Sequence, residues 1–209
     1  MDGLLLDTEP LWGESMFRVA NRHKIDITRK RMSETTGLRI YEVTDHWARH
    51  FPWEGKSAHD VAEEILDDII ALSKTSGRVM AGVVSLLELL AANQYKIGLA
   101  SSSPLRMITA LVEHFGIKDH FHAIVSADAV ALGKPHPAVF LHCAGLLDAQ
   151  PHECLVLEDS VNGIIAGKAA RMKVIAVPDL LHFDDPRLSI ADQKLQSLEY
   201  LDLELLRSI

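Results

Sequence analysis

The chain has 209 residues, of which 48% are hydrophobic and 24% are charged, a balance typical of a folded globular protein with room for one domain and an insertion. Its formal net charge is −8, and no basic cluster indicates a nucleic-acid-binding face. No apolar run approaches the ~20 residues of a membrane span, and the start lacks the basic region of a signal peptide. We therefore expect neither nucleic-acid nor membrane partners. We also expect a monomer located in the cytoplasm.

The chain contains two cysteines, Cys143 and Cys154. Both stand among apolar residues, which favours buried free thiols. Two isolated cysteines form no metal motif and no disulfide framework, as expected in a reducing cytoplasm.

A long helical stretch follows the first ten residues. Pro10 suits the first turn of a helix, Gly37 suits the end of one, and Ser57 is a good cap for a third. The predicted helices cover residues 11–22, 28–36, 40–50 and a long stretch from Ser57 to about residue 72. Because no strand is predicted between residues 11 and 77, we expect an independent helical unit there.

After Gly77 the pattern changes to helices alternating with short apolar strands. The predicted strands cover residues 97–100, 122–126, 155–157 and 174–177, and the predicted helices cover residues 83–92, 104–115, 137–147 and 198–206. Strands separated by helices of this length form βαβ units, so we expect an α/β fold with a parallel sheet. The segment 179–186 is expected to be a surface loop.

The stretch from Cys154 to Ala170 combines a buried strand with acids and a helix start. The strand ends on Glu158 and Asp159, and Ser160 then suits the N-cap of a helix. Ligands of open α/β sheets bind at the carboxyl ends of strands, and Mg²⁺ prefers carboxylate oxygens. The alternative is that both acids are solvated loop residues and that Asp159 helps to cap the helix.

Three further polar features stand where the predicted elements end. Ser101-Ser102-Ser103 follows a strand and precedes a helix, where hydroxyls and backbone N–H groups form an anion site or serve only as a cap. Lys134 lies beside two prolines that hold its loop extended, which suits a cation aimed at a phosphate, although lone loop lysines are usually solvated. Asp2-Gly3 is the third feature, and such a pair is commonly just a turn.

Together these motifs resemble the haloacid dehalogenase superfamily. Its signatures are an Asp-x-Asp-Gly opening, a strand ending in Ser or Thr, a Lys often in Lys-Pro-x-Pro, and a strand ending in acids. In the same order this chain has Met1-Asp2-Gly3, Ala100-Ser101, Lys134-Pro135-His136-Pro137 and Glu158-Asp159-Ser160-Val161-Asn162-Gly163. Within the superfamily the chain resembles the β-phosphoglucomutase-like branch. The run from Leu99 to Leu105 is similar to its bacterial sugar and hexitol phosphatases, including 2-deoxyglucose-6-phosphate phosphatase.

The resemblance implies a Rossmann-like parallel core with an inserted helical cap. The core would comprise residues 1–10 and 78–209, and the cap residues 11–77. The implied activity is a Mg²⁺-dependent phosphatase acting on small phosphorylated sugars or sugar alcohols, namely hexose and hexitol 6-phosphates, through an aspartyl-phosphate intermediate.

The same resemblance implies a role for each motif residue. Asp2 would be the general acid/base and would lend its backbone carbonyl to Mg²⁺. Ser101 and the backbone N–H of Ser102 would hold the phosphoryl oxygens, and Lys134 would offset their charge. Asp159 would bind Mg²⁺, with Glu158 ligating or supporting it.

One motif residue falls outside the chain. The nucleophile of the family is an Asp two places before Asp2, immediately before Met1, on a strand central to the family's sheet. We expect the parent protein to carry both, and the chain as given to be a poor catalyst because no aspartyl-phosphate forms without the nucleophile. The alternative, a protein that begins at Met1, is a non-catalytic phosphosugar-binding protein.

Trp12 bears on the choice between phosphatase and mutase. Mutases of the branch carry a cap-linker His, and its place in this chain is taken by Trp12, whose indole N–H cannot accept a proton. Trp12 is expected either to pack on an apolar sugar face or to belong to the cap core, and His23 is about three helical turns away, too far to substitute. This predicts hydrolysis, with a β-phosphoglucomutase-type mutase as the alternative.

Overall fold

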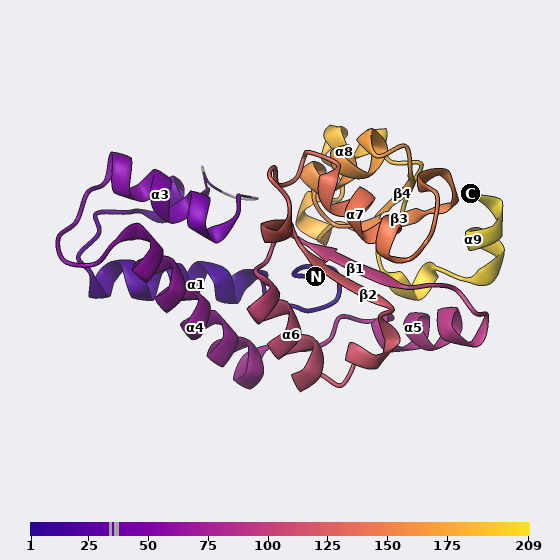
Figure 1. Cartoon of the computed structure of the whole chain (residues 1–209), viewed down its shortest axis with the longest axis horizontal. Coiled ribbons are helices and arrows are strands. Elements are labelled where there is room, and N and C mark those ends of the chain that lie inside the picture. The colour runs from indigo at the N-terminus through magenta and orange to yellow at the C-terminus, as the bar shows by residue number, and fades with distance from the viewer. Residues whose placement is uncertain (34, 36–37) are drawn as a thin grey trace.

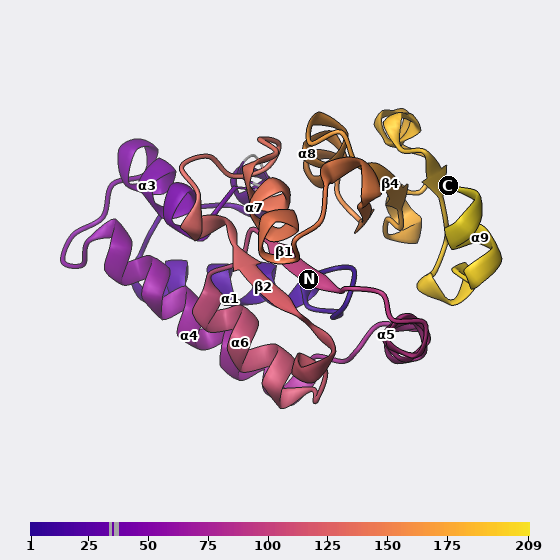
Figure 2. The ribbon, with the colours of Figure 1, turned by 45° about the vertical axis from the view of Figure 1, so that its right-hand side comes forward.

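The computed structural model describes residues 1–33, 35 and 38–209 of the chain. Its first part is helical, with α1 (Glu9–Arg22), α2 (Arg29–Ser33), α3 (Ile40–His50) and α4 (Ala58–Ser76). Figure 1 shows α1, α3 and α4 gathered at one end of the molecule, with the strands at the other. Figure 2 shows α4 running beside α6 (Leu105–His114). Among the described residues of 11–77 no strand is present, as the sequence pattern predicts.

The second part alternates helices with short strands. The strands are β1 (Gly98–Ser101), β2 (Ala123–Ser126), β3 (Leu155–Glu158), β4 (Lys173–Ala176) and β5 (Gln193–Lys194). The helices are α5 (Val83–Ala92), α6 (Leu105–His114), α7 (Ala138–Leu146), α8 (Val161–Ala169) and α9 (Leu203–Ser208). Short 3₁₀ turns are η1 (Lys118–His120), η2 (Ala127–Ala129), η3 (Pro151–Glu153), η4 (Leu180–His182), η5 (Pro186–Ile190) and η6 (Leu198–Tyr200).

All strand pairs are parallel, which confirms the predicted α/β class, but the strands form two separate sheets. One sheet has the order β1-β2, with Gly98 opposite Ala123. The other has the order β3-β4-β5, with Leu155 opposite Lys173. Within the described residues, β1 and β3 each have one edge without a partner strand.

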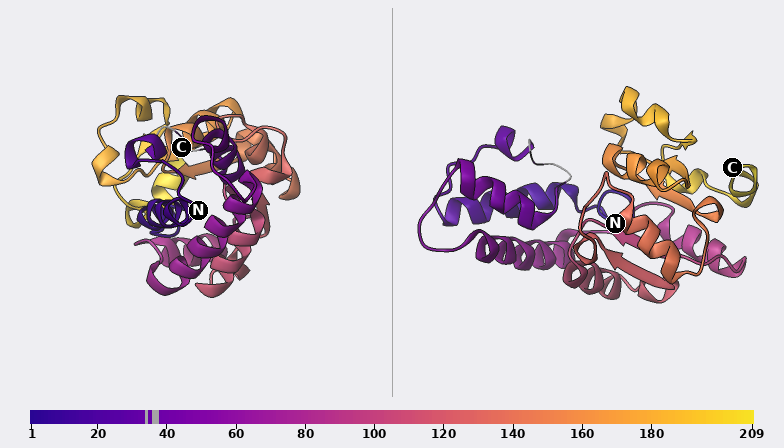
Figure 3. Two further views of the ribbon diagram at one scale, coloured as in Figure 1. Left: turned by 90° about the vertical axis from the view of Figure 1, so that its left-hand side faces the viewer. Right: turned by 45° about the horizontal axis from the view of Figure 1, so that its top comes forward.

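Helices cover the sheets and join them to the helical part. α7 packs on β1 and β2, α8 packs on β3 and β4, and α4 packs on α6 (Figure 3). One apolar cluster runs from Trp47 and Ile65 of the helical part to Met107 and Leu111 of α6. The packing is therefore continuous across residue 77, and the division into a core and a cap at that point stays a prediction.

Three of the helices, α1, α4 and α8, begin at residues that favour a helix start in the sequence. Pro10 lies in the first turn of α1. The hydroxyl oxygen of Ser57 accepts a hydrogen bond from the Asp60 N–H at the start of α4, and Ser160 accepts one from the Gly163 N–H at the start of α8. Each bond satisfies a backbone donor that the helix itself leaves unpaired.

A few expectations need correction. β5 was not predicted, because two polar residues carry no strand pattern. The helix expected at 28–36 spans Arg29–Ser33 in the structure, and the predicted closing residues Thr36 and Gly37 lie outside the described part. The helix expected at 198–206 is divided into η6 and α9, because the Asp202 side chain caps a new helix there.

Cys143 is buried as expected, whereas Cys154 is half-buried because it lies just before β3 begins. The segment 179–186 is mostly exposed and contains 3₁₀ turns. Among the helices of the described ranges, none is both long enough and apolar enough to cross a membrane.

A group of ion pairs around Glu64 ties α1 to α4. Its Oε2 lies 3.2 Å from Arg22 Nη1 and 2.8 Å from His23 Nε2, and its Oε1 contacts the Lys56 ammonium. The hydrogen bonds from Lys56 and His23 lower the pKa of Glu64 to about 2. Because this carboxylate is ionised in the folded state down to low pH, it stabilises the contact between the two helices.

We predict that Glu64→Gln lowers the melting temperature at pH 6 by about 2 °C, because partly exposed ion pairs contribute up to about 1 kcal/mol. The pKa of Glu64 is lower in the folded state than its ordinary value of 4.5, so the stabilisation is complete above that value and is lost as the pH falls toward 2. Thermal melts of the variant and of an exposed control, Glu54→Gln, measure this. A Glu64→Gln effect that stays constant down to pH 3 contradicts the prediction.

Candidate active site

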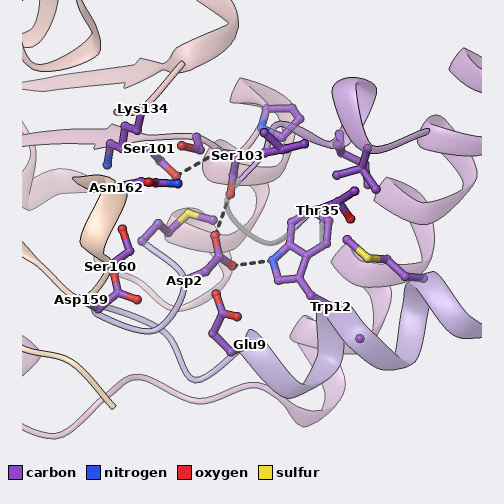
Figure 4. A pocket seen from close by; sticks show the side chains of 18 of the residues that line it. Asp2, Glu9, Trp12, Thr35, Ser101, Ser103, Lys134, Asp159, Ser160 and Asn162 are labelled. Atoms are coloured by element: carbon purple, nitrogen blue, oxygen red, sulfur yellow. Dashed lines mark hydrogen bonds between the residues drawn. The ribbon is translucent and has the colours of Figure 1, made fainter. Parts of the chain in front are cut away.

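A pocket of about 360 Å³ lies where the helical part meets the carboxyl ends of β1 and β3 (Figure 4). The residues predicted from the sequence as site residues all line it, namely Asp2, Ser101, Ser102, Lys134, Glu158 and Asp159. The other lining residues are Met1, Glu9, Trp12, Gly13, Met16, Met32, Thr35, Leu38, Ile40, Val43, Ser103, Pro104, Ser160 and Asn162. Motifs that are far apart in the sequence therefore converge on one cavity.

The serine loop after β1 is held by hydrogen bonds among its neighbours. Ser103 N–H donates to Ser101 Oγ at 3.1 Å. Ser126, at the end of the neighbouring strand β2, donates its hydroxyl to the Ser103 carbonyl at 2.8 Å. Since β1 and β2 are parallel, their carboxyl ends meet at the same edge, and the second strand fixes the loop of the first.

Lys134 reaches the pocket from the loop before α7. Its ammonium donates to Glu158 Oε1 at 2.5 Å and to the Ala100 carbonyl at 3.2 Å, and it lies 4.5 Å from the centre of the Phe140 ring. The side chains of Lys134 and Glu158 are each only 7% exposed. This buried pair therefore joins the end of β3 to β1.

Both oxygens of the Glu158 carboxylate are engaged. Oε1 accepts from Lys134, and Oε2 accepts from the Ser160 N–H at 3.1 Å and its hydroxyl at 2.9 Å. Burial alone would raise the pKa of Glu158, but the charge and hydrogen bond of Lys134 outweigh it and hold the pKa below its ordinary value. Of the two roles expected for Glu158, this arrangement favours the supporting role over direct metal ligation.

Asp2 is held by three side-chain donors, of which Trp12 and Ser103 are labelled in Figure 4. Its Oδ1 accepts from Thr8 Oγ1 at 2.6 Å and from Trp12 Nε1 at 3.1 Å. Its Oδ2 accepts from Ser103 Oγ at 2.7 Å. Neither Thr8 nor Ser103 was predicted to have such a role, although Ser103 stands in the serine motif, and Trp12 was expected only to pack against apolar surface. These bonds fix the orientation of the carboxylate.

Two other carboxylates, those of Asp159 and Glu9, line the pocket. Within the described residues, neither Asp159 nor Glu9 has a hydrogen-bond partner on another side chain or an ion pair. Burial, followed by the negative charge of Glu158, raises the pKa of Asp159 to about 7. Partial removal of its carboxylate from water, followed by the charge of Asp2, also raises the pKa of Glu9, although the residue as a whole is exposed.

This acidic edge of the pocket fits a hard cation such as Mg²⁺, which prefers carboxylate oxygens and keeps several waters. Asp159 would hold the ion with a carboxylate oxygen, and the Asp2 backbone carbonyl is a second candidate ligand. No group of three His, Cys, Asp or Glu side chains in the described part of the chain is placed to hold a metal ion. Water, substrate oxygens or further residues would have to complete the coordination.

Two glycines leave room for the acids. Gly3 has φ +73°, a conformation that favours glycine, and a Cβ on it would lie 2.5 Å from Asp159 Oδ2. A Cβ on Gly163 would lie 1.9 Å from Glu158 Cδ. The glycines at these positions are therefore required by the close approach of Asp159 and Glu158.

The parallel α/β core, with serines, a lysine and acids at its strand ends, is the arrangement of the hydrolase superfamily that the sequence resembles. The sequence profile of haloacid dehalogenase-like hydrolases matches residues 1–177. The chain belongs to this family.

The relatives of the chain include several phosphatases. It is 42% identical to hexitol phosphatase B of Escherichia coli (strain K12) over 202 residues, which cover 96% of this chain and 91% of that protein. It is 30% identical to the phosphorylated carbohydrates phosphatase of Thermotoga maritima over 185 residues, covering 84% and 81%. These relatives agree with the expected enzyme class, a phosphoric monoester hydrolase.

Solved structures share the fold. CbbY from Rhodobacter sphaeroides in complex with phosphate superposes with a TM-score of 0.89 at 24% identity, over 99% of this chain and 96% of that one. β-Phosphoglucomutase from Clostridium difficile superposes with a TM-score of 0.82 at 26% identity, over 99% and 92%. The predicted resemblance to the β-phosphoglucomutase-like branch is thereby confirmed.

We predict that Gly163→Ala lowers the free energy of unfolding by about 3 kcal/mol or more, because the new methyl group displaces Glu158 from its buried pair with Lys134. Urea denaturation measures the change. Gly145→Ala is the matched control, since Gly145 lies in α7 with open space around it, and alanine there is expected to be neutral or stabilising by up to about 1 kcal/mol. Equal effects of the two substitutions contradict the prediction.

Proposed function

We propose that this chain belongs to a Mg²⁺-dependent phosphatase that hydrolyses hexose and hexitol 6-phosphates through an aspartyl-phosphate intermediate. The observation that carries the proposal is the convergence of Lys134, the serine loop, Asp2 and Asp159 on one pocket. The hexitol phosphatase relative supports the substrate class. The substrate is then a small phosphorylated sugar or sugar alcohol, bound by a monomer in the cytoplasm.

The polar end of the pocket suits a phosphoryl group. The ammonium of Lys134 and the hydroxyls and N–H groups of Ser101 and Ser102 are donors that offset its negative charge. Mg²⁺, when bound, would supply further charge neutralisation at the phosphoryl oxygens. The serine loop and the lysine would therefore hold the phosphoryl group while its bond to the sugar oxygen breaks.

Asp2 is the proposed general acid and base. Its carboxyl group would give a proton to the departing sugar oxygen and later take one from the water that attacks the phosphoenzyme. The hydrogen bonds from Thr8, Trp12 and Ser103 orient it for both steps. The helical residues 11–77 would act as the cap that covers the substrate and excludes bulk water.

The nucleophile is proposed to be an Asp immediately before Met1, at the end of a strand that lies between β1 and β3. The unpaired edges of these two strands support a strand in that place. Lys134 also supports it, because the lysine contacts Ala100 on one side and Glu158 on the other and so lies beside the end of such a strand. Its ammonium would then offset the charge of the nucleophile.

We predict that a form extended upstream of Met1 by the in-frame coding sequence hydrolyses sorbitol 6-phosphate with Mg²⁺. The form Met1–Ile209 is expected to be at least about 1,000-fold slower, because it lacks the covalent route. Phosphate release measures both rates. The matched control is the extended form with its upstream Asp replaced by Asn, which should match the short form.

Equal and substantial rates of the two forms would rule out the proposed nucleophile. If neither form releases phosphate while both bind the phosphosugar, the alternative of a non-catalytic phosphosugar-binding protein is favoured.

Hydrolysis is proposed over phosphoryl transfer between sugar hydroxyls. The indole N–H of Trp12 donates to Asp2 and offers no base for a second sugar hydroxyl. We predict that the extended form, given β-glucose 1-phosphate, yields free phosphate and little glucose 6-phosphate. Product analysis by NMR measures the ratio, and predominant conversion to glucose 6-phosphate would show a β-phosphoglucomutase-type mutase instead.

A further inference from the structure

The two ends of the pocket differ in chemistry. The end at the strands carries Lys134, the serine loop and the carboxylates (Figure 4). The opposite wall comes from the helical part, and its described lining residues are Trp12, Gly13, Met16, Met32, Thr35, Leu38, Ile40 and Val43. Most of these side chains are apolar, so the part of a substrate farthest from its reacting phosphate meets a largely apolar surface.

The few polar groups of this helical wall are already engaged. The Trp12 N–H donates to Asp2 at 3.1 Å, and the Thr35 hydroxyl donates to the Met32 carbonyl at 2.9 Å. None of the described residues of the helical wall carries a positive charge.

Arg39 stands between two residues of the helical wall, but its guanidinium is bound elsewhere. Its Nε and Nη2 donate to Glu42 Oε1 at 2.9 and 2.5 Å. Its Nη1 donates to the carbonyls of Ala127 and Val130 at 3.4 and 3.3 Å. These contacts attach the start of α3 to the loop after β2, and they hold the charge of Arg39 away from the pocket.

We propose that the pocket selects substrates with a single phosphate and discriminates against bisphosphates. This inference rests on the proposed function and adds which phosphorylated compounds the pocket would exclude. A second phosphate would lie against the helical wall, where it would lose hydration and meet no cation among the described lining residues. The carboxylates at the other end add repulsion. A hexitol monophosphate instead presents only hydroxyls and C–H groups to this surface.

The test uses a matched pair, sorbitol 6-phosphate and sorbitol 1,6-bisphosphate. The extended form is assayed with Mg²⁺ for release of the first phosphate. Calorimetry in EDTA gives the Kd of each of the two compounds without turnover. We expect kcat/KM to be roughly 100-fold higher, and Kd roughly 100-fold lower, for the monophosphate than for the bisphosphate. The reason is that the second phosphate of the bisphosphate would be desolvated without a partner of opposite charge. A bisphosphate that binds as tightly as the monophosphate overturns the proposal.

A positively charged side chain added to the helical wall should reduce the preference for the monophosphate over the bisphosphate. Leu38 suits this substitution because it lines the pocket and is 45% exposed, so a long charged side chain fits without burial. We expect Leu38→Arg to tighten bisphosphate binding by at least about 10-fold, in a salt-dependent way. The matched control Leu38→Gln should not do so, and an equal gain in both variants contradicts a charge-based preference.

The assay separates this inference from the proposed function. If both substrates are hydrolysed at similar kcat/KM, the selectivity is wrong while the phosphatase assignment stands. If neither substrate is hydrolysed but the binding preference is kept, the phosphatase assignment fails and the selectivity of the pocket is supported.

Discussion

The buried contact of Lys134 with Glu158 is the interaction on which the rest of the site depends. The ammonium reaches Glu158 at the end of β3 and the Ala100 carbonyl in β1, two strands whose sheets share no backbone pairing in the described chain. Both charged side chains are almost fully buried. Removing one of them would leave the other buried and unpaired, which lowers the free energy of unfolding by about 3–5 kcal/mol in comparable buried pairs. The pair therefore fixes the distance between the two sheets and the direction of the lysine.

The geometry of the other acids follows from this pair. Lys134 and Ser160 engage both oxygens of Glu158, whereas the adjoining Asp159 has no side-chain partner among the described residues. Asp2 is fixed separately by three donors. The pocket thus joins a charged end built by the strands to a largely apolar wall built by the helices, and this difference supports the proposed preference for a substrate with one phosphate.

Much of this arrangement was predictable from the sequence, because helix caps, short apolar strands and the four motifs are local signals. Ser57 and Ser160 mark helix starts. Ser101 and Glu158 are the last residues of β1 and β3, as expected. The donors to Asp2 could not be found in this way, since Ser103 lies 101 positions from it in the chain. The same holds for Arg39, whose contact with Val130 spans 91 positions. Periodicity carries no information about such pairs.

We propose that this pocket transfers a phosphoryl group to an Asp immediately before Met1. The most direct measurement is to mix the extended protein with substrate, quench with acid and reduce with borohydride, which converts an aspartyl-phosphate to homoserine. Peptide mass spectrometry then locates the changed residue. We predict a single modified residue, the one before Met1, and its absence without substrate. Modification of Asp2 or Asp159 instead, or of no residue during active turnover, would contradict the account.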